Sequence, residues 1–143
     1  MSELREIDRI GEETMAEVMS VDAFIAGVTG WSDLKDDEEH EERDLWKRLA
    51  DVGGEEPEDY QPSLIDYVNL DVLELRVLGH RLLGDDEWET TGVSLLLTYG
   101  GPNVYLVWDG DESVSVEVYD GCEKTITRRR ATGLAAAFAD LVS

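Results

Sequence analysis

The feature that most constrains the fold is a change in the spacing of apolar residues near residue 70. Over residues 73–118 apolar and polar residues alternate, which is the period of a half-buried strand. We expect strands at residues 73–77, 93–99, 104–108 and 114–118, and a short edge strand at 125–127. Turn residues separate these runs, and Asp109-Gly110 predicts a hairpin with a two-residue turn. This part of the chain therefore predicts an antiparallel meander of four or five strands.

Before residue 70 the apolar spacing is helical. Ser2 is a suitable N-cap for a first helix, and Asp22 for a short second helix over residues 22–28. Residues 33–52 predict one further helix, because acids occupy its first turns, where the helix dipole favours anions, and an apolar stripe follows. Residues 55–62, with two prolines and four acids, predict an acidic loop.

Two more helices are expected later in the chain. Ser63 or Pro62 opens a short helix over residues 64–68. Thr132 is the expected cap of a closing helix that packs on the sheet. The residues that would face the sheet are Leu134, Phe138 and Leu141.

These elements are expected to form one domain. A chain of 143 residues, 42% of them hydrophobic, has the usual size of a single domain and is long enough to bury a core. We therefore expect one α+β domain over residues 1–143. Its acidic helical part spans residues 1–69, and its antiparallel sheet with the closing helix spans residues 70–143.

The chain is strongly acidic. It has 34 Asp and Glu against 12 Lys and Arg, a net charge of −22. The usual magnitude for a small soluble domain is about 2 to 8. Residues 1–60 hold 20 acids and 6 bases, so the front of the chain produces most of the negative field. Such a field opposes direct binding to nucleic acid or to an anionic membrane, and it favours a basic partner.

Neither a membrane span nor a secretion leader is expected. No stretch approaches the roughly 18 to 20 apolar residues of a span, and residues 1–6 lack a basic region followed by an apolar one. The single cysteine, Cys122, forms no internal disulfide, and we expect a buried or half-exposed thiol. These features predict a cytoplasmic protein.

The residues form no recognisable catalytic pattern. A nucleophile needs a neighbouring base, and His40 lies among four glutamates while His80 ends an expected strand. There is neither a nucleophile elbow nor a glycine-rich phosphate loop. Residues 109–113 alternate oxygen ligands as a calcium loop does, but they lack its downstream Gly and Glu, so a hairpin turn is preferred. We expect a non-enzymatic protein without a metal or a cofactor.

Two other groups of residues are possible contacts. Arg128-Arg129-Arg130 is a basic run, and we expect it to pair with this chain's own carboxylates, because these are so numerous. Trp88 lies among acids, whereas tryptophans usually belong to the core. If Trp88 is exposed, it is a candidate interface anchor.

The acids of the front half are the candidate partner-binding residues. Carboxylates at i, i+3 and i+4 on a helix lie about 5 to 6 Å apart, similar to phosphates along a strand, and a helix of about sixteen residues is roughly 24 Å long. Residues 36–44 thus predict an imitation of part of a phosphate track, which would occupy a basic channel built for DNA. The candidates are Asp36, Asp37, Glu38, Glu39, Glu41, Glu42 and Asp44 in the helix, and Glu55, Glu56, Glu58 and Asp59 in the loop.

Two features resemble known small proteins. Residues 95–106, LLLTYGGPNVYL, resemble a strand, turn and strand segment of small proteins from phages and mobile elements. The acidic front resembles, in charge pattern, anti-restriction and anti-CRISPR proteins that mimic DNA. That resemblance implies a non-enzymatic inhibitor in the host cytoplasm that blocks a basic nucleic-acid-binding complex, such as a CRISPR effector or a restriction enzyme. It places the contacts on acidic surface residues such as Asp36, Asp37, Glu38, Glu41 and Glu42.

A second explanation of the acids stays open. With nine Arg and three Lys, the acid excess is partly a shortage of lysine, which also fits a salt-adapted, haloarchaeal protein. At molar salt the screening length is about 3 Å, so crowded acids cost little and serve solubility. In this alternative the chain has a modest binding or structural role, and its acids are spread over every exposed face.

Overall fold

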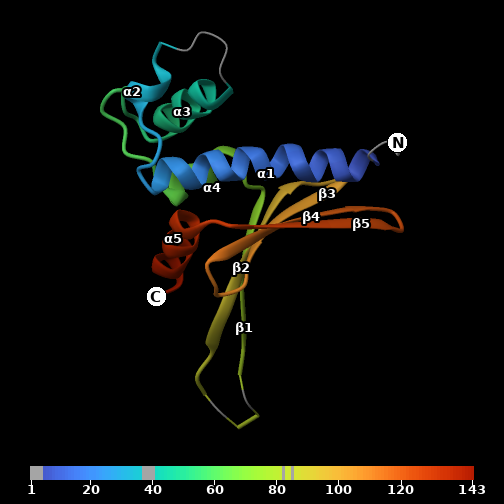
Figure 1. Ribbon diagram of the computed structural model, residues 1–143. Coiled ribbons are helices and arrows are strands. Elements are labelled where there is room, and N and C mark those ends of the chain that lie inside the picture. The colour runs from blue at the N-terminus through green and yellow to red at the C-terminus, as the bar shows by residue number, and fades with distance from the viewer. Residues whose placement is uncertain (1–4, 37–40, 82, 85) are drawn as a thin grey trace.

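The computed structural model describes residues 5–36, 41–81, 83–84 and 86–143. Within them, four helices precede five strands and a fifth helix ends the chain. The helices are α1 (Glu6–Ile25), α2 (Trp31–Leu34), α3 (Glu41–Val52), α4 (Leu64–Asp71) and α5 (Thr132–Val142). The strands are β1 (Glu74–His80), β2 (Glu89–Thr98), β3 (Asn103–Trp108), β4 (Ser113–Asp120) and β5 (Glu123–Arg130). They form one antiparallel sheet in the order β1-β2-β3-β4-β5, which confirms the expected α+β fold (Figure 1).

Two helices pack on one face of the sheet. α1 lies against β4 and β5, and α5 packs against α1 and the middle strands (Figure 1). The buried residues of α1 recur every three or four positions, which is the spacing of a single helix face. In α5, Leu134 and Phe138 are fully buried, and the Phe138 ring stacks on Trp108 of β3 with 5.8 Å between centroids. The prediction that the closing helix faces the sheet is confirmed for Leu134 and Phe138, whereas Leu141, the third predicted residue, is only partly buried against the core.

The first two expected helices are one. α1 continues through Asp22 to Ile25, so the prediction of a separate helix over residues 22–28 is wrong. α1 ends in a glycine turn: Gly27 has a φ of +77°, and the N–H groups of Gly27 and Val28 donate to the carbonyls of Phe24 and Ala23. This is a Schellman cap, whose left-handed position favours glycine. Ser2 lies outside the described residues.

α5 takes its N-terminal cap from α1. Its N-cap residue is Ala131 and Thr132 begins the helix, so the prediction that Thr132 caps it is wrong. Instead the Asp22 carboxylate accepts a hydrogen bond from the Leu134 N–H at 2.8 Å. Gly133 permits this approach, because a Cβ there would lie 2.8 Å from the Asp22 carbonyl oxygen. Asp22 therefore joins two helices far apart in sequence.

The single helix expected over residues 33–52 is also wrong. α2 ends at Leu34 and α3 begins at Glu41, with residues 37–40 outside the described part of the chain. Trp31 of α2 stacks on Trp46 of α3 with 6.4 Å between ring centroids. One straight helix would place residues fifteen apart about 22 Å from each other. The chain folds back because both tryptophans bury apolar surface in the same cluster.

Ser63 opens α4 as expected: its hydroxyl accepts a hydrogen bond from the Asp66 N–H. Two details of the sheet differ from expectation. β5 pairs with β4 from Glu123 to Arg130, well beyond the short strand expected at 125–127. The hairpin between β3 and β4 forms, but residues 109–112 connect the strands, so a two-residue turn is wrong.

Candidate functional site

The acidic loop after α3 is held by aromatic side chains. The indole N–H of Trp46 donates to the carbonyl of Pro57 at 2.9 Å, and the Trp46 ring meets Tyr60 edge-on with 5.6 Å between centroids. Both aromatic residues are buried. This hydrogen bond and this ring contact hold the loop against α3, while the acids of the loop are exposed to solvent. The exposed acids are Glu55, Glu56, Glu58 and Asp59.

A groove of about 1130 Å³ lies between α1 and α3. Both walls are acidic: α1 contributes Glu13 and Glu17, and α3 contributes Glu41, Glu42 and Asp44. Arg48 is the one base among the described residues that line it. The carboxylates of α3 belong to its first turn, where the helix dipole stabilises negative charge. This groove concentrates carboxylates from two helices around one space.

Glu17 is the most perturbed acid of the groove. It also lines a neighbouring cavity of about 250 Å³ together with Asp71, Arg48 and Tyr67. Burial and a hydrogen bond shared with the Asp71 carboxyl raise the pKa of Glu17 to about 7, while the Arg48 charge acts in the opposite direction. The groove therefore gains negative charge as the pH rises through neutrality.

The structure brings only some of the predicted site residues together. Glu41, Glu42 and Asp44 line the groove, and Asp36 is exposed in the turn after α2. The predicted loop acids form a separate exposed group. Asp37, Glu38 and Glu39 lie outside the described residues. The straight helix expected to carry the phosphate track is interrupted in the described residues, because Asp36 lies in the turn after α2 and α3 begins at Glu41.

The sequence interpretation missed the opposite wall. Glu13 and Glu17 are four residues apart, and Ala16 and Ser20 share their helix face and line the same groove. In the sequence, these residues occupy the helix positions that do not belong to the apolar stripe of α1. Nothing in the neighbouring sequence indicates that a second helix lies across them.

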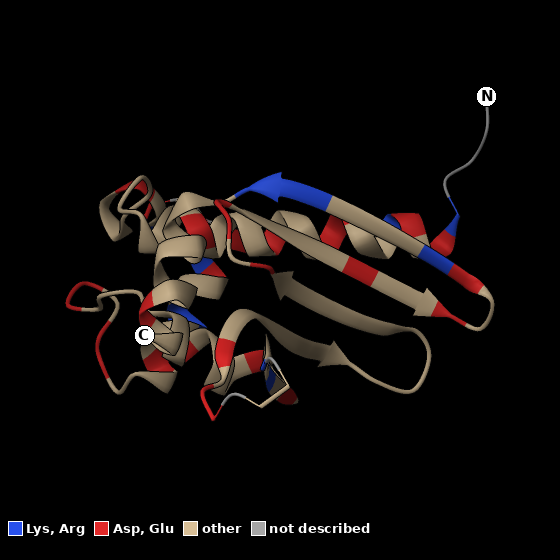
Figure 2. Cartoon of the chain, turned by 90° about the horizontal axis from the view of Figure 1, so that it is seen from below, with Lys and Arg blue, Asp and Glu red and all other residues tan. Residues whose placement is uncertain are grey.

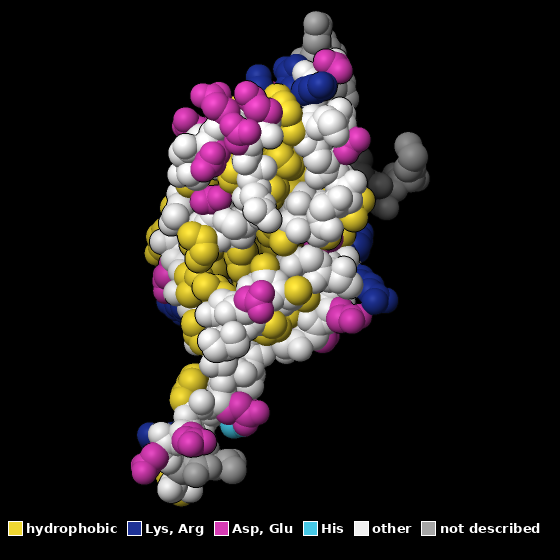
Figure 3. Space-filling view, turned by 90° about the vertical axis from the view of Figure 1, so that its left-hand side faces the viewer, with side chains coloured by type: hydrophobic (Ala, Val, Ile, Leu, Met, Phe, Trp, Pro, Cys, Tyr) yellow, Lys and Arg dark blue, Asp and Glu magenta, His cyan; other side chains and the backbone are white. Residues whose placement is uncertain are grey.

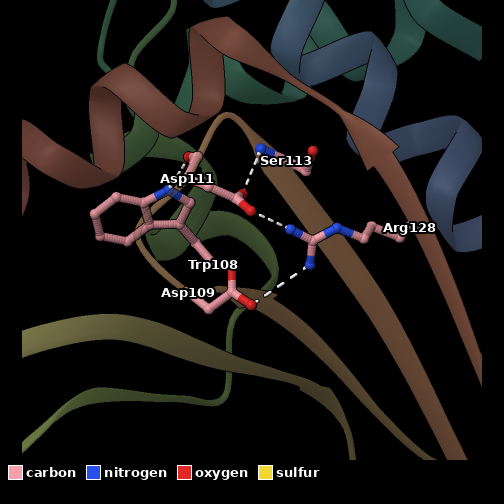
Figure 4. Close-up of polar contacts among 5 residues, drawn as sticks. All are labelled: Trp108, Asp109, Asp111, Ser113 and Arg128. Atoms are coloured by element: carbon pink, nitrogen blue, oxygen red, sulfur yellow. Dashed lines mark hydrogen bonds and ion pairs between the residues drawn. The ribbon is translucent and has the colours of Figure 1, made fainter.

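The arginine run pairs with the chain's own acids, as expected. Arg128 contacts Asp109 at 3.4 Å and also the carboxylate of Asp111 (Figure 4). The same turn is closed by Trp108, whose indole N–H donates to the carbonyl of Asp111 at 2.7 Å, and by Ser113, whose N–H donates to the Asp111 carboxylate at 2.8 Å. These contacts explain why residues 109–113 form a wide hairpin turn.

The other arginines of the run have acidic partners too. Arg129 lies 3.7 Å from Glu12 of α1, and Arg130 lies 2.8 Å from Glu112. All these pairs are well exposed, so each contributes at most about 1 kcal/mol to stability. Each arginine of the run therefore has a carboxylate of this chain beside it.

The remaining candidate residues are on the surface. His80 lies 3.3 Å from Glu89 across the β1–β2 pair, and His40 is outside the described residues. Cys122 is exposed, which corrects the expectation of a buried or half-exposed thiol. Trp88 is 58% exposed and therefore meets the condition for an interface anchor. Among the described residues, no group of three His, Cys, Asp or Glu is placed to hold a metal ion.

Acidic side chains are not confined to the groove. Figure 2 shows Asp and Glu on helices and strand ends throughout the fold. Figure 3 shows a denser gathering at the end of the molecule that α2, α3 and the following loop form. The acids thus combine a broad distribution with one local concentration.

Comparison of the chain with protein-family models, with curated proteins and with solved structures gave no match. Within the described residues, no helix combines the length and apolar character needed to cross a membrane.

Proposed function

We propose that the protein is a non-enzymatic inhibitor that occupies a basic nucleic-acid-binding surface of another protein. The observation that carries this proposal is the groove between α1 and α3, whose two walls hold five carboxylates against one arginine. Two acidic walls attract a lysine or arginine side chain from both sides, so a basic segment fits this groove better than any anion.

The geometry changes how mimicry of a nucleic acid would operate. A straight helix would display carboxylates outward like phosphates, whereas the groove receives cationic side chains between two helices. The exposed loop of Glu55, Glu56, Glu58 and Asp59 supplies further negative charge at the end of α3. A CRISPR effector or a restriction enzyme has a basic nucleic-acid channel of the kind this surface would block.

The test compares two sets of charge reversals. The groove variant carries Glu41→Lys, Glu42→Lys and Asp44→Lys. The control carries Asp120→Lys, Glu123→Lys and Asp140→Lys at exposed positions outside the groove lining, and it changes the net charge equally. Binding of a labelled oligoarginine peptide is measured for both variants by fluorescence anisotropy, with circular dichroism to verify folding.

We expect the groove variant to weaken peptide binding at least about tenfold, equivalent to about 1.4 kcal/mol, and the control to weaken it much less. Partners captured from a host extract should include a nucleic-acid-binding protein that duplex DNA displaces. Equal weakening by both variants, or capture of a partner without a nucleic-acid-binding surface, would contradict the proposal.

A salt-adapted protein is the second candidate function class, and the spread of acids over helices and strand ends favours it (Figure 2). If solubility in salt is the role of the acids, the free energy of unfolding should fall sharply between molar salt and about 0.1 M salt, where the screening length grows to about 10 Å. Cooperative folding in dilute buffer with little loss of stability would exclude this candidate.

A further inference from the structure

Exposed apolar side chains gather on β1, the edge strand of the sheet. Leu73, which precedes it, is 64% exposed, and Leu75 and Val77 within it are 37% and 45% exposed. In the described sheet β1 pairs with β2 alone, so its outer edge carries unpaired N–H and C=O groups. The β1–β2 hairpin extends beyond the helices that cover the rest of the sheet (Figure 1).

The exposed side chains continue the apolar layer of the core. Leu75 is opposite Leu95 and Val77 is opposite Val93, and both β2 residues are fully buried. Because paired residues of neighbouring strands share a face, Leu75 and Val77 point to the side of the sheet that the helices cover elsewhere. An added strand beside β1 would extend this layer and cover them.

The local charge differs from that of the chain as a whole. Residues 73–83 contain Arg76 and Arg81 against a single acid, Glu74, in a chain of net charge −22. The strand runs without irregularity from Glu74 to Leu78, where a bulge before Gly79 changes the register. The regular stretch itself therefore carries one acid and one base, whose charges cancel.

The sequence of the regular stretch is self-complementary when two copies run antiparallel. With Leu75 opposite Leu75 of a second copy, Glu74 lies opposite Arg76 and Leu73 opposite Val77, twice by symmetry. Within one chain Arg76 already pairs with Glu74, which shows that these side chains share a face. In a pair of copies, each Glu74 on that face would lie opposite Arg76 of the other copy.

We propose that β1 pairs antiparallel with β1 of a second copy in this register, which joins two sheets into one. Apolar residues meet on the core-facing side, and two Glu74–Arg76 pairs form on the other side. Opposite charges placed directly across strands stabilise the pairing, and like charges destabilise it.

The test exchanges the two charged residues. The molar mass of the full chain is measured by analytical ultracentrifugation over a range of concentrations, at a salt concentration that screens the net charge. The variants are Glu74→Arg, Arg76→Glu, the double exchange, and an equimolar mixture of the two single variants. Circular dichroism verifies that each is folded.

We expect the wild-type chain to dimerise and each single variant to dimerise about tenfold more weakly, since both cross-strand pairs become like-charged. The double exchange should restore the dimer. In the mixture, one chain has arginine and the other glutamate at both positions, so a mixed dimer should form. A wild-type chain that stays monomeric overturns the proposal. A dimer that the single variants leave unchanged, or that neither the double exchange nor the mixture restores, also overturns it.

Discussion

Replacement of Glu17 by glutamine should stabilise the protein at high pH and have little effect at low pH. Burial and the neighbouring Asp71 raise the pKa of Glu17 from 4.5 to about 7. Between these values the folded state binds a proton that the unfolded state has released. The free energy of unfolding therefore falls as the pH rises from about 4.5 to about 7. Above about pH 7 the whole of this loss of stability is present.

The size of the effect follows from the shift. Each pKa unit corresponds to about 1.4 kcal/mol, so the whole shift would correspond to roughly 3 kcal/mol. Glu17 is only partly buried, and solvent screening reduces this value to about 1 to 2 kcal/mol. Glutamine has nearly the same shape, carries no charge and can donate a hydrogen bond to the Asp71 carboxylate.

Urea unfolding followed by tryptophan fluorescence measures the difference. At about pH 8 we expect Glu17→Gln to raise the free energy of unfolding by about 1 to 2 kcal/mol, and near pH 5 the gain should be much smaller. Glu13→Gln, at an exposed position one turn earlier on α1, measures the general effect of removing one negative charge. A gain that is equal at both pH values, or equal for Glu13→Gln, would refute the assignment of a raised pKa to Glu17.

Two further substitutions test the packing of α5. Asp22→Ala should lower the free energy of unfolding by about 0.5 to 2 kcal/mol, because the Leu134 N–H loses its acceptor, whereas Asp22→Asn keeps an acceptor and should cost less; urea unfolding separates them. Phe138→Ala should cost about 3 to 5 kcal/mol in the same assay, because it removes a fully buried ring stacked on Trp108. Ala139→Ser, exposed on the same helix, should stay within about 0.5 kcal/mol of wild type, and a similarly small effect of Phe138→Ala would contradict the packing of α5.

The sheet was predictable because its signals are local. Alternation along β2, β3 and β4 separates buried from less buried positions, and glycine-containing turns mark the boundaries. β1 has the same alternation, yet most of its residues are exposed. The pattern predicts a strand there but does not reveal whether a helix covers it, since coverage depends on where distant elements pack.

The predicted helix boundaries were wrong where a contact with a residue far away in the sequence determines the local structure. Asp22 is a typical N-cap residue, but inside α1 its carboxylate is used by Leu134 of another helix. The acids before α3 looked like the first turns of one helix, but Trp31 and Trp46 pack together only if the chain reverses between them. In both cases the sequence around the residue does not indicate which distant residue it contacts.

In the candidate site, too, some residues were predictable from the local sequence and others were not. Glu41, Glu42 and Asp44 were predicted because acidic residues are frequent in that segment, which the local sequence shows directly. Glu13 and Glu17 were not, because their role depends on α3 lying across α1. The groove is therefore a property of the packing of two helices, which composition does not determine.

α3, which forms one wall of the groove, lies at one end of the molecule, and the β1–β2 hairpin extends from the other (Figure 1). A dimer through β1 would leave both grooves open, because the residues that line the groove belong to α1 and α3. Two grooves on one particle bind a partner with repeated basic sites more tightly than either does alone, because the second contact becomes intramolecular. Weak, salt-sensitive binding by one groove would then suffice for a stable complex.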